Sequence, residues 1–314
     1  MPYDAILLVS FGGPERTQDV IPFLENVLRG RNVPRERMLQ VAEHYYHFGG
    51  CSPINQQCRE LIAALRREVT LPVYWGNRNW HPLLNDTVRQ MAAEGVRRVV
   101  AIATSAYSSY SGCRQYIENI AAARAAAGDG APVIDKLPPF WAHSGFVEAN
   151  ADRVAAALAR IPAERRPAAR LVFTAHSIPQ AMATQCRYEE QLVETARRVS
   201  ARVGHEEWDL VWQSRSGPPS QPWLEPDILD HLRALAANGV TDVVAAPIGF
   251  LSDHMEVLYD LDTEAAGLAD QLGLNFVRAQ TAGTHPAILA MLKELIEAPV
   301  VVCAEGCCPA PRRA

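Results

Sequence analysis

The feature that most constrains the fold is an alternation of two kinds of segment along the chain. Short runs of β-branched and other apolar residues alternate with longer stretches rich in alanine and arginine. This alternation is typical of parallel strands joined by crossover helices, so the predicted fold class is α/β. The expected strands cover residues 5–10, 72–76, 98–104, 170–175, 210–213, 243–249 and 275–279. The expected helices cover residues 17–28, 56–69, 83–94, 113–127, 146–160, 188–203, 228–238 and 286–298.

The pattern also repeats once within the 314 residues. Residues 94–96 (Glu-Gly-Val) precede one expected strand as residues 238–240 (Asn-Gly-Val) precede another. The shared needs of any βα unit could produce the same likeness, but a chain of this length usually forms more than one core. We therefore expect two similar halves, each a parallel sheet flanked by helices. The expected boundaries are 1–145, 146–300 and a cysteine-rich tail at 301–314.

Composition excludes several classes of function. A net charge of -5 argues against a broad phosphate-binding surface, so nucleic acid is not an expected partner. No apolar run reaches the roughly 18 residues of a membrane-spanning helix, although peripheral membrane contact stays open. The N-terminus lacks the basic segment of a signal peptide, so the expected location is the cytoplasm. The expected oligomeric state is a monomer.

Four loops are the first candidates for a binding site. In open parallel sheets, ligands bind beyond the carboxyl ends of the strands. The expected strands place residues 10–14, 104–113, 175–179 and 249–256 in that position.

His176 and Glu256 are the candidate reactive side chains in these loops. His176 follows an apolar strand directly, and its plain alternative is a hydrogen-bonded structural histidine. In the stretch after residue 249, a helix would place Glu256, Tyr259 and Asp260 on one face, and we assign capping of that helix to Asp253. An imidazole and a carboxylate can hold a divalent metal or move a proton. Two such ligands leave a metal incompletely coordinated, which suits an ion that is delivered rather than stored.

Five strings resemble the ferrochelatase family and occur in the family's order. They are Leu-Leu-Val-Ser-Phe-Gly-Gly-Pro (7–14), Gly-Gly-Cys-Ser-Pro-Ile-Asn (49–55), Thr-Ala-His-Ser-Ile-Pro (174–179), Trp-Gln-Ser-Arg (212–215) and Gly-Phe-Leu-Ser-Asp-His-Met-Glu-Val-Leu-Tyr-Asp (249–260). The resemblance implies two Rossmann-like halves with the active-site cleft for the porphyrin between them, Fe2+ as a substrate and no organic cofactor.

The same resemblance implies roles for individual residues. His176 matches the family's base and metal ligand, and Glu256 matches its acidic partner, with His254 and Asp260 in support. Ser52 and Tyr116 match porphyrin contacts, and the porphyrin edge is expected near His44 and Tyr45. Phe11 stands where some relatives have an iron-ligating tyrosine, and phenylalanine cannot ligate iron. Binding that bends the macrocycle would expose the pyrrole nitrogens to the metal.

The cysteines form a second candidate site. Cys303, Cys307 and Cys308 lie in the tail, and Cys113 lies in a candidate loop. Four thiols can supply the ligands of a [2Fe-2S] cluster, and the pattern resembles family members that carry one. The alternatives are four free thiols or a four-thiolate zinc site. The other three cysteines, Cys51, Cys58 and Cys186, are interpreted as buried or incidental.

The opening loop, the Ser-Gly-Cys loop and the cysteine tail together look most like bacterial coproporphyrin III ferrochelatases. The expected reaction is therefore Fe2+ insertion into coproporphyrin III in heme biosynthesis. The alternatives are insertion into protoporphyrin IX and insertion of cobalt or nickel into a related tetrapyrrole. A module that binds heme or another tetrapyrrole without metalating it is the alternative outside enzymes.

Overall fold

The computed structural model describes residues 2–30, 33–217, 220–301, 303 and 306–310. The chain divides into two compact units. Unit 1 comprises Met1–Thr104, Gln115–Pro138 and Leu292–Cys303. Unit 2 comprises Ser105–Arg114, Pro139–Met291 and Ala304–Ala314.

Unit 1 is built on a parallel four-stranded sheet with the order β2-β1-β3-β4. Strand β1 lies in the interior of the sheet and is buried along its whole length, as its apolar sequence requires. The strands are β1 (Ala5–Ser10), β2 (Val73–Asn77), β3 (Arg98–Ala103) and β4 (Val133–Lys136). The helices are α1 (Val20–Val27), α2 (Arg35–His47), α3 (Ile54–Glu68), α4 (Leu84–Ala93) and α5 (Gln115–Ala127), with a 3-10 turn η1 at Thr17–Asp19.

Two separate groups of apolar side chains stabilise unit 1. Residues of α4 and α5, such as Val88 and Ile120, pack against one face of β1 and β3. A smaller core joins α1 to α2 through Phe23, Leu24 and Met38. This second core lies next to the residues that follow β1 and β2, and it therefore fixes part of the candidate binding surface.

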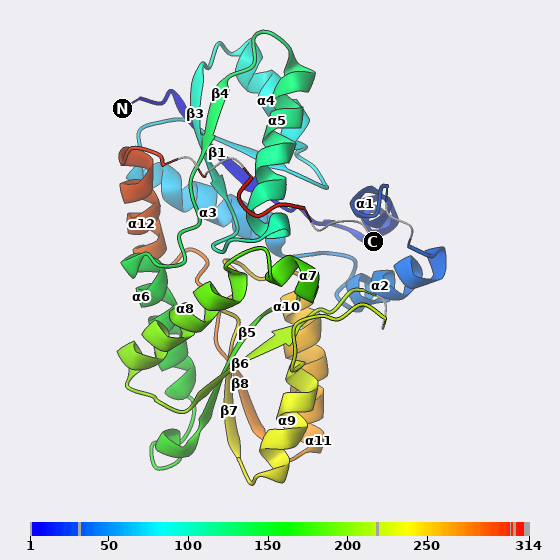
Figure 1. Ribbon diagram of the computed structural model, residues 1–314, viewed down its shortest axis with the longest axis vertical. Helices are drawn as coiled ribbons and strands as arrows, with labels where there is room; N and C mark the ends of the chain where they lie inside the picture. Colours follow the sequence, from blue (N-terminus) through cyan, green and yellow to red (C-terminus); the bar gives the residue numbers. More distant parts are fainter. Residues whose placement is uncertain (1, 31–32, 218–219, 302, 304–305, 311–314) are drawn as a thin grey trace. The chain divides into compact units, whose positions relative to one another are not determined.

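Unit 2 repeats the topology with the strand order β6-β5-β7-β8, and all its strands are parallel. Figure 1 shows these strands side by side, with α6 and α8 on one flank and α9 and α11 on the other. The strands are β5 (Arg170–His176), β6 (Trp208–Gln213), β7 (Asp242–Ala246) and β8 (Asn275–Arg278). The helical elements are η2 (Tyr110–Arg114), α6 (Ser144–Leu158), η3 (Arg166–Ala168), α7 (Gln180–Ala183), α8 (Tyr188–Val203), α9 (Ile228–Ala237), α10 (Met255–Val257), η4 (Leu258–Ala265) and α11 (Ala266–Gln271). Helix α12 (Pro286–Glu297) contributes residues to both units.

The predicted fold class is confirmed, because each unit has a parallel sheet with flanking helices and the same strand order. The repeated sequence pattern has a structural counterpart: Gly95 and Gly239 both follow a helix with positive φ, at 75° and 78°. That conformation is easy for glycine and ends the helix before the next strand. The boundaries expected for the halves and the tail stay predictions.

Two elements of unit 1 were not expected. The strand β4 is short and carries Asp135 and Lys136, so it lacks the apolar run by which the other strands were predicted. Helix α2 buries only Met38 and Ala42, and this apolar stripe is too narrow to stand out in the sequence.

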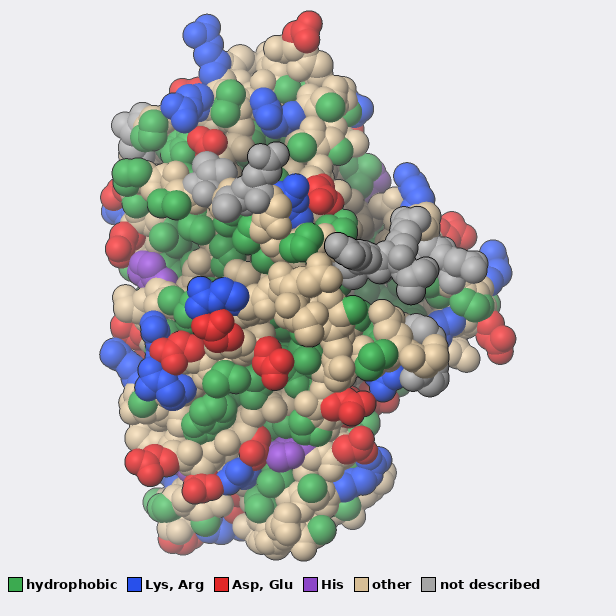
Figure 2. Space-filling view, in the orientation of Figure 1, with side chains coloured by type: hydrophobic (Ala, Val, Ile, Leu, Met, Phe, Trp, Pro, Cys, Tyr) green, Lys and Arg blue, Asp and Glu red, His purple; other side chains and the backbone are tan. Residues whose placement is uncertain are grey.

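The surface agrees with the modest net charge of -5. On the face seen in Figure 2, acidic and basic side chains are interspersed. Among the residues that the structure describes, no helix is long and apolar enough to cross a membrane.

Candidate active site

His176 is the last residue of β5, which is a central strand in the sheet of unit 2. It therefore lies at the edge of the sheet where the strands have their carboxyl ends. The strand before it is buried, whereas the His176 side chain is 28% exposed. Pro179 then begins the short helix α7, so the chain turns away immediately after the histidine. The chain also packs closely against β5 at Gly249. A Cβ atom at this position would lie 2.5 Å from the Cβ of Ala175, so only glycine fits there without a shift.

One contact orients the imidazole of His176, and a second holds the backbone of this residue. Its Nδ1 atom forms a close contact with the main-chain carbonyl of Ser177, which can only accept a hydrogen bond. Nδ1 therefore carries the proton and donates it. The hydroxyl of Tyr188 donates to the main-chain carbonyl of His176 at 3.1 Å. The other ring nitrogen, Nε2, is left to face Glu256.

The Nε2 atom of His176 lies 3.5 Å from Oε1 of Glu256. Burial by itself would lower the pKa of His176, but the charge of Glu256 and a hydrogen bond to it raise this pKa to about 9. At neutral pH the pair is therefore an imidazolium next to a carboxylate. A divalent cation can replace the proton between them, because both groups are also metal ligands.

His254 holds the backbone of Glu256 in place through a hydrogen bond. His254 caps α10, and its Nδ1 atom accepts the main-chain N–H of Glu256 at 3.2 Å. Burial lowers the pKa of His254, so its ring stays neutral and able to accept this bond. The prediction that Asp253 caps this helix is wrong: Asp253 forms an ion pair with Arg278 at 3.2 Å. The capping position falls one residue later because the backbone of His254 is extended there.

Asp260 lies on the π-helix η4, one turn beyond Glu256. Burial raises the pKa of Asp260 to about 7, and the nearby charge of Glu256 adds to this effect. Ser214 donates its hydroxyl hydrogen to Oδ2 of Asp260, and Gln213 donates an amide hydrogen to the same oxygen at 3.3 Å. A carboxyl group with a pKa near 7 can gain and lose a proton under physiological conditions.

Three residues near Glu256 and Asp260 were assigned no role from the sequence: Gln213, Ser214 and Glu264, although the first two lie in the string 212–215. Gln213 ends β6, so the rule that ligands bind beyond strand ends could have identified it. Glu264 follows Asp260 by four residues, and its pKa is raised by burial and then by Asp227. The charges of Glu256 and Glu264 both add to the effect of burial on the pKa of Asp260.

The expected porphyrin contacts lie in unit 1. Phe11 and Tyr45 each meet the ring of Phe23 edge-on, with centroids 6.2 and 5.7 Å apart. The guanidinium of Arg78 lies 4.7 Å from the ring centre of Tyr116 and 5.7 Å from that of Phe11. Three expected residues, Phe11, Tyr45 and Tyr116, therefore lie next to Phe23 or Arg78. These last two residues were not expected.

The remaining two expected contacts are Ser52 and His44. Ser52 is buried, and its main-chain N–H donates to the carbonyl of Pro14 at 2.8 Å. It packs against Gly13, where a Cβ atom would lie 2.7 Å from the Cβ of Ser52. Ser52 thus supports the loop that carries Phe11, while His44 precedes Tyr45 on α2.

The four candidate cluster cysteines are divided between the two units. Cys113, Cys307 and Cys308 belong to unit 2, and Cys303 belongs to unit 1. The sulfur atoms of Cys307 and Cys308 are 3.6 Å apart. Burial, followed by the neighbouring thiols of Cys307, Cys113 and Cys186, raises the pKa of Cys308 to about 12.

The thiol of Cys186 lies near those of Cys307 and Cys308, and its interpretation as a buried or incidental residue stays a prediction. Within the part of the chain that the structure describes, no group of three or more His, Cys, Asp or Glu side chains is arranged to hold a metal ion.

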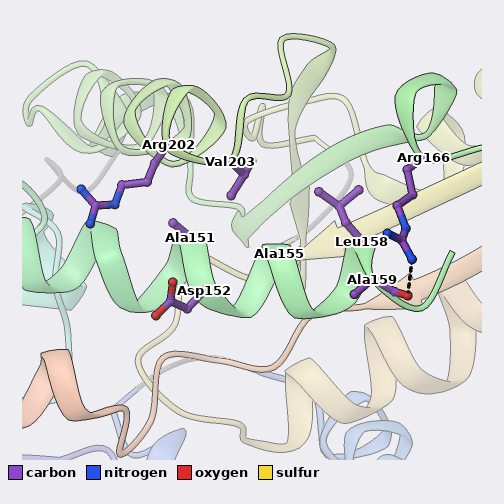
Figure 3. Close-up of a pocket in the computed structure, with 8 residues that line it drawn as sticks. All are labelled: Ala151, Asp152, Ala155, Leu158, Ala159, Arg166, Arg202 and Val203. Carbon is purple, nitrogen blue, oxygen red and sulfur yellow. Dashed lines mark hydrogen bonds between the residues drawn. The ribbon is translucent and has the colours of Figure 1, made fainter. Parts of the chain in front are cut away.

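A separate hollow lies on unit 2 between α6 and α8, with a volume of about 460 Å³. Figure 3 shows Arg166 and Arg202 on either side of an alanine-rich floor. Arg166 already donates to main-chain carbonyls, and Arg202 pairs with Glu148 at 3.5 Å. None of the candidate site residues lines this hollow.

Comparison with solved structures identifies the fold. SirB from Bacillus subtilis with Fe3+ matches with a TM-score of 0.60 and 13% identity, over 93% of each chain. The sirohydrochlorin chelatase SirB from Bacillus subtilis subspecies spizizenii in complex with cobalt matches with a TM-score of 0.55 and 15% identity, over 93% of this chain and 94% of that one. The chain therefore has the two-part α/β fold of the chelatases.

Comparison of sequences narrows this class. The ferrochelatase family model matches residues 3–299, so the chain belongs to the ferrochelatase family. A ferrochelatase of Rhodopirellula baltica is 56% identical, over 94% of this chain and 86% of its own. The coproporphyrin III ferrochelatases of Nocardia farcinica and Mycolicibacterium smegmatis are 49% and 53% identical. The matches cover 100% and 95% of this chain, and 98% and 90% of theirs.

Proposed function

We propose that the protein inserts Fe2+ into coproporphyrin III and so produces coproheme for heme biosynthesis. The observation that carries the proposal is the 3.5 Å approach of His176 Nε2 to Glu256 Oε1 at the end of β5. Relatives of about 50% identity over nearly the whole chain are named for this substrate. The porphyrin and Fe2+ are substrates, and the reaction needs no organic cofactor.

Insertion releases two pyrrole protons for each Fe2+ that enters the ring, and His176 and Glu256 would handle these protons. The imidazolium of His176 must first lose a proton, and an approaching cation favours this loss by repulsion. The Glu256 carboxylate is the nearest acceptor. Nε2 of His176 can then bind the metal or take a pyrrole proton, because the bond from Nδ1 to Ser177 keeps the lone pair on Nε2.

Asp260 would pass protons onward from Glu256. Its pKa near 7 matches this task, since it can accept a proton and release it without a large change in free energy. His254 would keep the start of α10 in place by accepting the N–H of Glu256. Its role is therefore to position Glu256.

Unit 1 would supply the porphyrin-binding residues. Phe11 and Tyr45 offer aromatic surface, which suits a flat macrocycle, whereas the buried Tyr116 would act by holding the guanidinium of Arg78. Ser52 holds the loop that carries Phe11, and His44 is proposed for the edge of the ring. Phe11 has no oxygen, so this residue cannot ligate the product iron. The cleft between the halves stays a prediction.

We also propose that Cys113, Cys303, Cys307 and Cys308 bind a [2Fe-2S] cluster. The buried Cys113 and the 3.6 Å contact of Cys307 with Cys308 support it, and the arrangement of the described cysteines fits only in part. A bound cluster would supply thiolate-iron bonds that tie the tail to the chain. The protein is proposed to act as a monomer in the cytoplasm.

Absorption spectra of the purified protein under anaerobic conditions test the function. Fe2+ and free coproporphyrin III should give the spectrum of coproheme at a rate proportional to enzyme concentration. Parallel incubations contain protoporphyrin IX in place of coproporphyrin III, or Co2+ or Ni2+ in place of Fe2+. Tight porphyrin binding without metalation by any of these ions would contradict the proposal and identify a binding module.

A further inference from the structure

Gln213 connects the two parts of the candidate active site. It is the register partner of His176 in the pairing of β5 with β6, and its main-chain carbonyl accepts the N–H of Ser177 at 2.8 Å. Its side-chain Nε2 atom donates to the main-chain carbonyl of Glu256 at 3.1 Å and to Oδ2 of Asp260 at 3.3 Å. Gln213 thus contacts β5, which carries His176, through its backbone. Through its side chain it contacts α10 and η4, which carry Glu256 and Asp260.

The orientation of the Gln213 amide follows from these partners. The carbonyl of Glu256 can only accept, so the NH2 group must point toward it. The other end of the amide, Oε1, is buried and has no hydrogen-bond partner among the residues that the structure describes. Gln213 is only 1% exposed, and a buried acceptor without a partner destabilises the folded state. Packing alone would be served better by an apolar side chain at this position.

The neighbouring residue reinforces the same arrangement. Ser214 has a φ of 62°, an unusual conformation for a residue with a side chain. This conformation directs its hydroxyl to Asp260, on the oxygen that Gln213 also contacts. The end of β6 therefore holds η4 through two consecutive side chains.

We propose that Gln213 is a positioning residue for metal insertion: its amide fixes Glu256 and Asp260 relative to His176. The proposal rests on the proposed function of this site. It explains why a polar side chain occupies a buried position at a strand end. It also implies that the separation of His176 and Glu256 depends on the β6 strand, which carries neither of them.

The test replaces Gln213 with leucine, which has a similar size and no donor. Three quantities are measured: kcat for Fe2+ insertion into coproporphyrin III, the Kd of coproporphyrin III from fluorescence quenching, and the Kd of Co2+ for porphyrin-free protein by calorimetry. We expect kcat to fall about tenfold or more, the porphyrin Kd to stay within about twofold, and Co2+ affinity to fall about fivefold. A structural role alone would not separate kcat from porphyrin affinity in this way.

Gln191 provides the matched control. It is also a buried glutamine of unit 2, and its amide joins Ser108 in the 104–113 loop rather than His176, Glu256 or Asp260. Gln191→Leu should lose stability but keep kcat within about twofold in the folded fraction. If Gln213→Leu does not fold, Gln213→Met keeps the length of the side chain and removes the donor without adding a charge, and the same kcat and Kd criteria apply.

The outcomes separate this inference from the proposed function. A folded Gln213 variant with kcat and Co2+ affinity within about twofold of the wild type would overturn the positioning role and leave the metalation reaction intact. A wild-type protein without turnover would overturn the proposed function instead. In that case the Co2+ titration alone still decides whether Gln213 positions the metal ligands.

Discussion

Nε2 of His176 and Oε1 of Glu256 lie 3.5 Å apart, although the two residues are 80 positions apart in the chain. The ring of His176 is held by Ser177, and the backbone of Glu256 is held by His254 and Gln213. The pair is therefore positioned before any substrate arrives. Such preorganisation is what a site for rapid metal and proton transfer requires.

His176→Ala should abolish metalation while porphyrin binding persists. The substitution removes the metal ligand and the proton acceptor but leaves the aromatic residues of unit 1 in place. We expect kcat to fall by about 10²-fold or more and the Kd of coproporphyrin III to change little. Stopped-flow absorbance and fluorescence quenching measure the two quantities. Near-normal turnover would refute the role of His176.

Glu256→Gln should show whether metalation needs the charge of Glu256 or only the size of its side chain. The amide keeps the size of the side chain but cannot accept the proton of His176 as a carboxylate does. We expect a loss of kcat of about tenfold to 10²-fold, with porphyrin affinity within about twofold. A titration of His176 by NMR should show its pKa lowered from about 9, because the charge of Glu256 is among the causes that raise it. An unchanged rate would transfer proton relay to Asp260 or His254.

The substrate should be coproporphyrin III rather than protoporphyrin IX. Coproporphyrin III carries four propionates, and charge-assisted hydrogen bonds contribute about 1.5–3 kcal/mol each. One additional bond in the transition state would raise kcat/KM by about tenfold or more. Parallel initial-rate measurements with both porphyrins decide the point. A preference for protoporphyrin IX would contradict the assigned substrate but not the chelatase activity.

The cysteine site predicts a coloured protein. Anaerobically purified protein should be reddish-brown and contain about two irons and two sulfides per chain, as a [2Fe-2S] centre requires. Serine at Cys113, Cys303, Cys307 or Cys308 should remove the colour and lower the melting temperature. Serine at Cys51 or Cys58 provides the control and should preserve the colour. Colourless, fully active protein without acid-labile sulfide would disprove the cluster.

Asp260→Asn should stabilise the metal-free protein at neutral and higher pH. The pKa of Asp260 is raised from 3.8 to about 7, so the folded state keeps a proton that the unfolded chain releases. The free energy of unfolding therefore falls as the pH rises between these values, and the cost stays present above them. Asparagine removes this cost, and we expect a gain of about 1–3 kcal/mol at pH 8 that shrinks toward pH 4.

Urea unfolding at both pH values measures the effect of Asp260→Asn. Asp262→Asn is the contrasting control, because Asp262 forms an ion pair with Arg278 at 2.7 Å and its loss should destabilise the protein. A gain in stability that does not depend on pH would contradict the assignment of the raised pKa to Asp260.

The amino-acid sequence predicted the parts of the structure that have local causes. Apolar strand segments and strand ends identified β5, His176 and the loop that carries Glu256. Hydrogen bonds between residues far apart in the chain became visible only in the structure. Gln213 reaches Glu256 and Asp260 across 43 and 47 positions, and no local pattern encodes that reach. The capping prediction for Asp253 failed because the extended backbone of His254, which the sequence does not show, decides which side chain caps the helix.

The π-helix η4 makes the number of residues in this segment as important as their identity. A π-helix pairs residues five positions apart and an α-helix pairs residues four apart, so removing one residue from Leu258–Ala265 would let α-helical bonding resume and change the spacing of side chains within the segment. A deletion between Asp260 and Glu264 would bring them three positions apart instead of four, even though both carboxylates would still be present. Length variation in this segment is consequently a more damaging kind of change than most single substitutions, and a chain with every acidic residue intact could still lose the spacing on which Asp260 depends.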